Sequence, residues 1–329
     1  MQSFGTLLST AKRSMNIVQS PRASAILYHL LKSQGNASPW LLPANICPIV
    51  PLTFFKARIP FAFVDISAES LHMDLEQAWR RLERGVYGGL LYAHTYGEPS
   101  TPEAFFRRVK SRYPNLLLVD DRCLCVPSLD PPQQTSADAI LYSTGYAKIV
   151  DLDFGGYAFL KEGLAYQPEH LSFDPRALEE IEQGYKRAIQ NRSQYTYTDR
   201  DWLQTEADLP TWDDYRQQIE SGLEASLKHR DTINGIYARR LPREIQLPQD
   251  YQTWRFNVRL KDKEQVLEGI FASGLFASSH YASLAGIMAP GRCPQTERLA
   301  KEIINLFNDR HFDPQKAEGV CAVIMEKLT

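Results

Sequence analysis

Cysteine is scarce in this chain, with five residues among 329. Disulfide-dependent secreted domains carry a far higher share, so a disulfide scaffold is excluded. Cys123 and Cys125 are separated by one residue, which does not match the two-residue spacing of common zinc and redox sites. We therefore expect reduced thiols and no bound metal.

Long apolar runs and an excess of one charge are also lacking. No stretch approaches the roughly 20 apolar residues that a membrane-spanning helix needs. Residues 1–16 contain no long apolar segment behind a basic tip, so no signal peptide is expected. Lys and Arg number 37 against 39 Asp and Glu, and this balance does not favour binding to nucleic acid. We expect a soluble, cytoplasmic protein that binds neither membrane nor nucleic acid.

The composition is that of a globular protein with a large core, 43% hydrophobic and 11% aromatic. A length of 329 residues exceeds the roughly 100–200 residues of a typical single domain. We predict a large α/β domain over residues 1–230 and a smaller α+β domain over residues 231–329.

Short apolar runs alternate with helical segments between residues 20 and 160, as is typical of an α/β domain with a mostly parallel sheet. In such sheets ligands bind at the carboxyl ends of the strands, so the polar residues that follow the strands are the candidates for a site. The runs predict strands over Trp40–Leu42, Pro60–Val64, Gly89–Ala93, Leu116–Val119, Ala139–Ser143 and Gly156–Leu160.

Helical spacing and capping residues predict the helices. Apolar residues from Ala23 to Leu31 recur at helical intervals. Asp74 begins a second helix with Gln77 as its capping-box partner, and Pro102 occupies the first position of a third. Beyond residue 160 we expect helices over 176–190, 211–240, Lys263–Ala272, Pro294–Phe307 and Pro314–Leu328, with a strand over Thr253–Leu260.

Polar residues after three predicted strands suggest one chemistry when taken together. Lys148 could hold a carbonyl cofactor as a Schiff base, and Asp121 could keep a pyridine nitrogen protonated. Ser143, with Ala23 and Ser24 at the start of the first helix, could hold a phosphate group. Each residue taken alone is more often a cap, a turn or a solvated surface position.

Five segments resemble the sugar aminotransferases of the DegT/StrS group, which are pyridoxal-phosphate (PLP) enzymes of fold type I. Four of them agree with that family in order and spacing, and the fifth, in the tail, agrees loosely. They are PANICPIVPLTFFKARIPFAFVDI (43–66), LYAHTYGEPS (91–100), LLLVDDRCLC (116–125), LYSTGYAKIVDLDFGGYAFL (141–160) and, in the tail, HYASLAGIMAPGRCPQTERLAKEIINL (280–306).

The resemblance implies the cofactor PLP and a role for each matching residue. Lys148 would be the Schiff-base lysine and would carry a proton between carbon atoms. Asp121 would pair with the pyridine nitrogen, and Ser143 would bind the phosphate. Ala23 and Ser24 stand where the family has a Gly-Thr pair.

The resemblance also implies the reaction and the partners. Family members move an amino group from glutamate or glutamine to a nucleotide-linked keto-sugar, and they are homodimers with the site at the subunit interface. His94, His280 and Tyr281 are weaker candidates for contact with the sugar. Cys47 replaces an aromatic residue that stacks on the cofactor, and Leu124 replaces a glutamine.

Two alternative interpretations stay open beside the aminotransferase. The replacements at Cys47 and Leu124 favour a non-catalytic or PLP-binding-deficient homologue that acts as a binding or regulatory subunit. A PLP-dependent sugar dehydratase would use the same cofactor for another reaction.

Overall fold

The structure is a computed structural model that describes residues 15–35 and 37–328. The prediction that there is no signal peptide concerns residues 1–16. Residues 1–14 of this segment lie outside the described residues.

A seven-stranded sheet forms the centre of the molecule, in the order β1-β7-β6-β5-β4-β2-β3. The neighbours from β3 to β6 pair in parallel, whereas β7 pairs antiparallel with both β6 and β1. The α/β fold with a mostly parallel sheet is therefore confirmed. The strands are β1 (Met15–Ser20), β2 (Trp40–Pro43), β3 (Phe61–Val64), β4 (Gly89–Ala93), β5 (Leu117–Asp121), β6 (Ala139–Ser143) and β7 (Gly156–Lys161).

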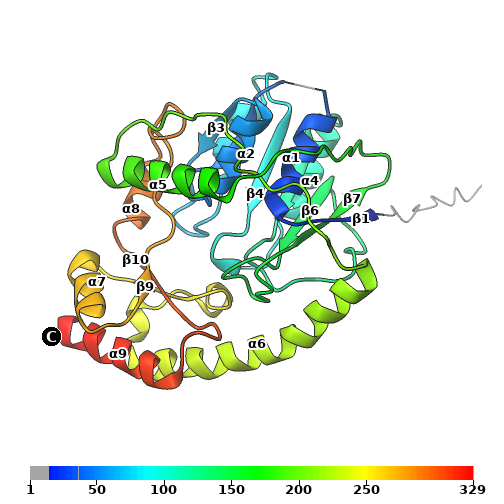
Figure 1. Cartoon of the computed structure of the whole chain (residues 1–329). Coiled ribbons are helices and arrows are strands. Elements are labelled where there is room, and N and C mark those ends of the chain that lie inside the picture. Colours follow the sequence, from blue (N-terminus) through cyan, green and yellow to red (C-terminus); the bar gives the residue numbers. More distant parts are fainter. Residues whose placement is uncertain (1–14, 36, 329) are drawn as a thin grey trace, which may run out of the picture.

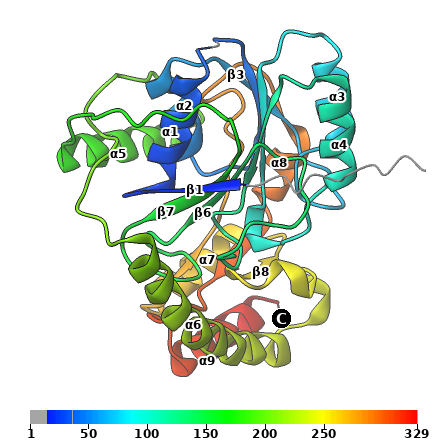
Figure 2. The same cartoon turned by 90° about the vertical axis from the view of Figure 1, so that its right-hand side faces the viewer.

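Helices cover both faces of this sheet (Figure 2). One face carries α1 (Ala23–Ser33), α2 (Ile49–Ala57) and α5 (Pro175–Asn191). The other carries α3 (Leu75–Leu82), α4 (Glu103–Arg112) and the first half of α6 (Trp212–Arg240). The short 3-10 turn η1 (Thr95–Gly97) follows β4.

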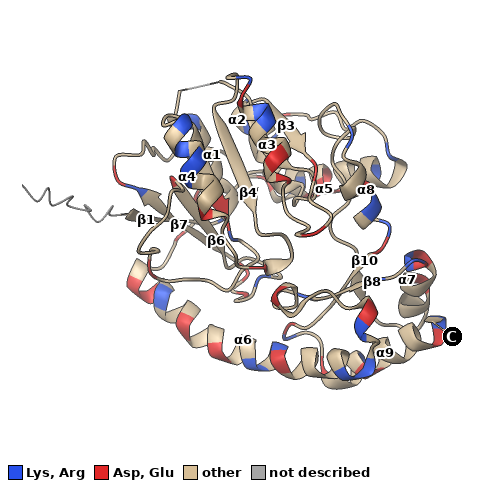
Figure 3. Cartoon of the chain, turned by 180° about the vertical axis from the view of Figure 1, so that it is seen from behind, with Lys and Arg blue, Asp and Glu red and all other residues tan. Residues whose placement is uncertain are grey.

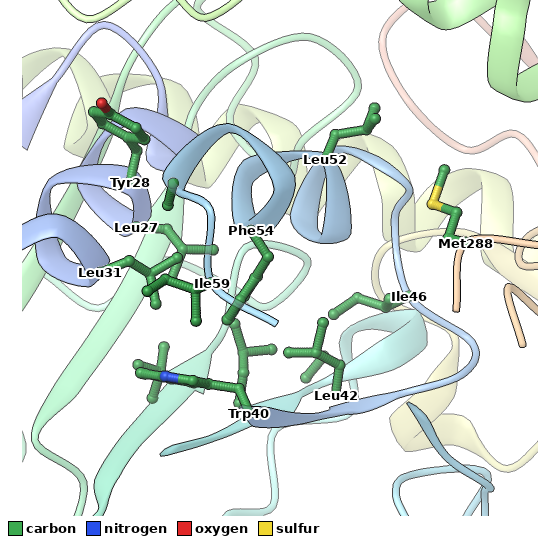
Figure 4. Close-up of a cluster of buried hydrophobic side chains, with 14 of the residues drawn as sticks. Leu27, Tyr28, Leu31, Trp40, Leu42, Ile46, Leu52, Phe54, Ile59 and Met288 are labelled. Carbon is green, nitrogen blue, oxygen red and sulfur yellow. The ribbon is translucent and has the colours of Figure 1, made fainter. Parts of the chain in front are cut away.

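Successive side chains of each strand enter opposite cores, because the side-chain period of a strand is two residues. In β5, Leu117 and Val119 belong to the core beneath α1 and α2, and Leu118 belongs to the core beneath α4. Figure 4 shows part of the first core, where Trp40 of β2 lies below Phe54 of α2. Their ring centroids are 5.4 Å apart in an edge-on contact.

The C-terminal part has its own buried core, formed by residues between 233 and 324. α6 runs from the large sheet to this second core along the lower side of the molecule (Figure 1). It crosses the boundary expected between residues 230 and 231, so the division into two domains stays a prediction. The elements are η2 (Arg243–Ile245), η3 (Gln249–Tyr251), β8 (Phe256–Arg259), α7 (Lys263–Ala272), β9 (Ala277–Ser278), α8 (Pro294–Leu299), β10 (Ile303–Leu306) and α9 (Pro314–Leu328).

The predicted helix over Pro294–Phe307 is wrong in its second half. α8 ends at Leu299, and Ile303–Leu306 forms β10, the central strand of a three-stranded sheet between β8 and β9. All residues of β10 are buried. Two neighbouring strands that are distant in the sequence decide this conformation, which local helical spacing does not reveal.

The capping box expected at α3 is only half correct. Asp74 accepts a hydrogen bond from the Gln77 backbone N–H at 2.9 Å, as predicted. The Gln77 side chain instead accepts from the Asp65 N–H at 2.8 Å. Asp65 in turn caps α8 by accepting from the N–H and hydroxyl of Thr296, both at 2.9 Å. This segment therefore ties the large sheet to the C-terminal part.

Charges of both signs are interspersed along α6 in Figure 3. Among the described residues, none of the helices is long and apolar enough to cross a membrane. Within the same residues, no group of three His, Cys, Asp or Glu side chains is placed to hold a metal ion.

Candidate functional site

A cavity of about 240 Å³ opens at the carboxyl ends of β4, β5 and β6, beside the start of α1. Parallel strands bring their carboxyl ends to one edge, which explains how segments far apart in sequence meet here. The predicted site residues that line it are Ala23, Ser24, Cys47, His94, Asp121, Ser143, Lys148 and Tyr281.

Strand parity separates the two adjacent aspartates of β5. Asp121 lies on the same side of the strand as Val119, toward the core beneath α1, and it lines the cavity. Asp120 lies on the opposite side, as Leu118 does. Ser143 shares the parity of Leu141, which pairs with Asp121 in the register of β5 and β6. The carboxylate and the hydroxyl therefore face the same side of the sheet.

Asp121 is oriented by the loop that follows its strand. One of its carboxylate oxygens accepts a hydrogen bond from the Cys123 N–H at 3.0 Å. The side chain is 9% exposed. A carboxylate held in this way can meet a protonated ring nitrogen.

Two glycines allow the start of α1 to reach the end of β6. A Cβ on Gly156 would lie 2.5 Å from the Cα of Ala23 and closer still to its backbone nitrogen. Gly155 has a φ of +96°, and its Cβ would lie 2.6 Å from the Thr144 hydroxyl oxygen. Only residues without a side chain permit this approach, which places the first amides of α1 beside Ser143.

Lys148 lies on a loop that is held at several points. The preceding residue, Ala147, has a left-handed φ of 61°, a conformation that costs a non-glycine residue about 1–3 kcal/mol. Its N–H donates to an Asp151 oxygen at 3.0 Å, and its carbonyl accepts from the Trp254 indole at 2.8 Å. These contacts fix the backbone from which the Lys148 side chain enters the cavity.

Arg230 of α6 holds the Lys148 carbonyl from the other side. Its guanidinium donates to the carbonyl oxygens of Lys148 at 2.9 Å and Trp254 at 2.7 Å, and to Asn308 Oδ1 at 2.5 Å. Arg230 is 2% exposed. Burial, reinforced by the positive charge of Arg255, lowers its pKa to about 10.

Two thiols, those of Cys47 and Cys123, also line the cavity. Burial raises the pKa of Cys47, although the Lys148 ammonium opposes the shift. Burial and the Asp121 carboxylate raise the pKa of Cys123 well above its usual value. Both thiols are therefore neutral at neutral pH. Cys47 and Leu124, which replace an aromatic residue and a glutamine, both line the cavity.

Tyr281 and His280 enter this region from the C-terminal part. The ring of Tyr281 is stacked on Trp254, with centroids 6.3 Å apart and planes 6° apart. Burial, together with Cys47 and other neighbours, raises the pKa of Tyr281 well above its usual value. His280 packs on both rings but does not line the cavity. Burial and the positive charges of Arg255 and Lys148 lower its pKa to about 4.

Both ring nitrogens of His94 already bind protein groups. One is 2.7 Å from Asp120 Oδ1 and the other 2.7 Å from the Glu98 carbonyl. Asp120 also accepts from Arg122 Nε at 2.8 Å. Burial would raise the pKa of Asp120, but the hydrogen bond from His94 and the Arg122 charge outweigh it and lower that pKa. These hydrogen bonds mean that His94 positions the end of β4. Contact between His94 and a sugar stays a prediction.

Sequence reasoning missed several residues that shape the site. Asn45 lines the cavity, and Arg230 and Trp254 hold the Lys148 loop. Arg22, which the sequence places immediately before the predicted phosphate-binding helix, also lines the cavity. Arg230 has no such signal, because its partners are distant in the sequence.

Comparison with solved structures identifies the fold. The chain is 15% identical to a DegT DnrJ EryC1 StrS aminotransferase from Brucella abortus, with a TM-score of 0.68 over 95% of this chain and 86% of that one. This chain has the fold of that aminotransferase. The sequence prediction of PLP fold type I is confirmed at the level of the fold.

Two further structures give the same result. Sugar aminotransferase CalS13 from Micromonospora echinospora is 15% identical, with a TM-score of 0.62 over 94% of this chain and 87% of that one. The PMP-form of Spr1654 from Streptococcus pneumoniae is 14% identical, with a TM-score of 0.69 over 96% of this chain and 89% of that one. No protein-family profile and no curated protein sequence matches this chain.

Proposed function

We propose that this protein is a PLP-dependent aminotransferase that acts on a nucleotide-linked keto-sugar, with glutamate or glutamine as the amino donor. The observation that carries the proposal is the meeting of Lys148, Asp121, Ser143 and the start of α1 around one cavity. The fold shared with sugar aminotransferases supports it.

The groups around the cavity fit a phosphorylated pyridoxal. The first turn of α1 contains no acidic residue, and its N-cap residue Arg22 makes no side-chain cap among the described residues, so the first amides, those of Ala23 and Ser24, face no competing cap there. Ser143 adds a hydroxyl beside those amides. Asp121 supplies a carboxylate for the ring nitrogen, and Lys148 supplies an amine.

PLP, when bound, supplies an electron sink for reactions at carbon. Ser143 and the first amides of α1 would bind its phosphate. Asp121 would hold a proton at the ring nitrogen by charge pairing. Lys148 Nζ would bind the cofactor and then, once released, take up and return a proton as a general base and acid.

The decisive experiment is the visible absorption spectrum of the protein after PLP is added and the excess is removed. Wild type and Lys228→Ala, which changes an exposed lysine, should both retain a visible band. Lys148→Ala should lose it. If wild type retains no cofactor, the proposal fails.

A second measurement separates the reactions. Keto-sugar nucleotides are incubated with the PLP-loaded protein, with and without glutamate or glutamine. An amino sugar that forms only with a donor supports aminotransfer. A dehydrated product that forms without a donor would point to the dehydratase.

The lining of the cavity at Cys47 and Leu124 favours one alternative, a homologue that binds ligands without catalysis. A thiol and an isobutyl group offer neither the contact area of an aromatic ring nor the hydrogen bonds of an amide. Absence of a visible band in the wild type, with the fold intact by circular dichroism, would support this alternative.

Two further parts of the proposal rest on the resemblance to the DegT/StrS sugar aminotransferases and on the separate buried core of the C-terminal part. We propose that residues 231–329 form a small domain over the cavity and that the protein is a homodimer. Sedimentation equilibrium, with and without PLP, tests the second statement, and a monomer under both conditions contradicts it.

A further inference from the structure

Arg22 stands directly before α1, yet no hydrogen bond or ion pair of its side chain occurs among the residues that the structure describes. Its backbone is extended, with φ −148° and ψ 144°, and its carbonyl accepts from the Ala25 N–H at 3.0 Å. The side chain forms no capping hydrogen bond. Its Nε is buried without a hydrogen-bond partner in the described part of the chain.

A buried donor without an acceptor is unfavourable, and such groups in native proteins usually have a partner. A guanidinium also carries a charge at every accessible pH and presents its N–H groups as a planar fork. Among the described residues 15–35 and 37–328, no ion pair to Arg22 occurs. The side chain therefore lacks an anionic acceptor, and it lines the cavity where one could bind.

The surroundings of Arg22 favour an anion over any other ligand. The first turn of α1 has no acidic residue, and the helix dipole places partial positive charge there. Arg22 also forms a bridge with Gly155, which fixes its backbone beside the end of β6. Arg22, Ala23, Ser24 and Ser143 all line the same cavity.

We propose that Arg22 binds the phosphate group of the cofactor and makes this chain select phosphorylated over unphosphorylated pyridoxal. The inference rests on the proposed function, because it concerns the ligand of the same cavity. Two N–H groups of a guanidinium can bind two phosphate oxygens at once, which neither a serine nor a backbone amide can do alone.

The test compares the affinities of wild type, Arg22→Gln and Arg22→Lys for PLP and for pyridoxal, measured by absorption titration. Arg22→Gln should weaken PLP binding about 10- to 100-fold, the value of a charged hydrogen bond. Its affinity for pyridoxal should be unchanged. Arg22→Lys should lie between the two, because it keeps the charge and loses the fork. Arg84→Gln, which changes an exposed arginine, is the matched control.

A second probe separates this inference from the proposed function. Inorganic phosphate is titrated with each protein, and the width of its ³¹P resonance is measured. Broadening by wild type and Arg84→Gln, but not by Arg22→Gln, supports the inference even if PLP does not bind. Equal broadening by wild type and Arg22→Gln overturns it, as does the absence of broadening and of PLP binding in wild type.

Two further outcomes also decide the question. Equal weakening of PLP and pyridoxal in Arg22→Gln would mean that Arg22 supports the shape of the cavity, which overturns the inference. If Arg22→Gln does not fold, Arg22→Lys decides it. If Arg22→Lys loses affinity for PLP but not for pyridoxal, the inference is supported. If the ratio of its PLP and pyridoxal affinities equals that of wild type, the inference is overturned.

Discussion

Replacement of Arg230 by methionine tests whether a buried guanidinium fixes the Lys148 loop. The change would remove hydrogen bonds to the carbonyls of Lys148 and Trp254 and to the side chain of Asn308. Methionine fills much of the same space and bonds to none of them. The three acceptors would then lose their guanidinium donor.

The magnitude follows from these three bonds. Each is worth about 1 kcal/mol net, so their loss should lower the free energy of unfolding by about 3 kcal/mol. Burial of the Arg230 cation is itself unfavourable, and it lowers the pKa of that side chain to about 10. This cost offsets part of the stabilisation from the three hydrogen bonds, so we expect no larger loss of unfolding free energy.

The assay is urea unfolding at pH 7, followed by tryptophan fluorescence, with the change taken from the midpoint and slope. Arg239→Met, an exposed position on the same helix, should change the free energy by less than about 0.5 kcal/mol. A change as small as this in Arg230→Met would refute the reasoning. As a second readout, a lysine-selective reagent should label Lys148 faster in Arg230→Met, because the loop is released.

Two further predictions concern the ends of the strands. Gly156→Ala should lose about 1–3 kcal/mol of unfolding free energy, because the new Cβ overpacks against Ala23. Gly145→Ala is the control, and its loss should be smaller because its new Cβ meets only ordinary contacts. Equal losses in the two variants would contradict the close approach of Gly156 to Ala23. Asp120→Asn should lose about 3 kcal/mol at pH 7 by breaking the buried pair with His94. Because the folded state lowers the pKa of Asp120, its contribution is present above the unfolded pKa of about 3.9 and is lost as the pH falls. The gap between Asp120→Asn and wild type should therefore narrow below about pH 4, and a gap that widens in acid would contradict this sign.

Local patterns in the sequence predicted most of the α/β part. The long helix expected over 211–240 is present as α6, and Thr211 caps its start by accepting a hydrogen bond from the Asp214 N–H at 3.3 Å. The buried strands β4 and β6 have the predicted bounds. These features depend on residues a few positions apart, and periodicity and capping report such short-range preferences.

Strands that depend on distant partners could not be predicted in this way. β1 pairs with β7, where Met15 is opposite Lys161, and no local signal marks it as a strand. The sequence predicts a helix over the residues of β10 because their apolar side chains continue the helical spacing of α8. Its conformation follows from pairing with β8 and β9. Strand pairing is set by neighbours on the sheet, which lie anywhere in the chain.

The residues that could carry the chemistry are evident in the amino-acid sequence, since Lys148, Asp121 and Ser143 follow apolar runs and match a family pattern. The folded chain adds three facts that the sequence does not contain: these residues line one cavity, Asp120 faces the opposite side of the sheet, and Arg230 and Trp254 hold the Lys148 loop. The reason is physical. Strand ends and buried hydrogen bonds bring together residues that are far apart along the chain, and such contacts exist only after the cores on both faces of the sheet have formed.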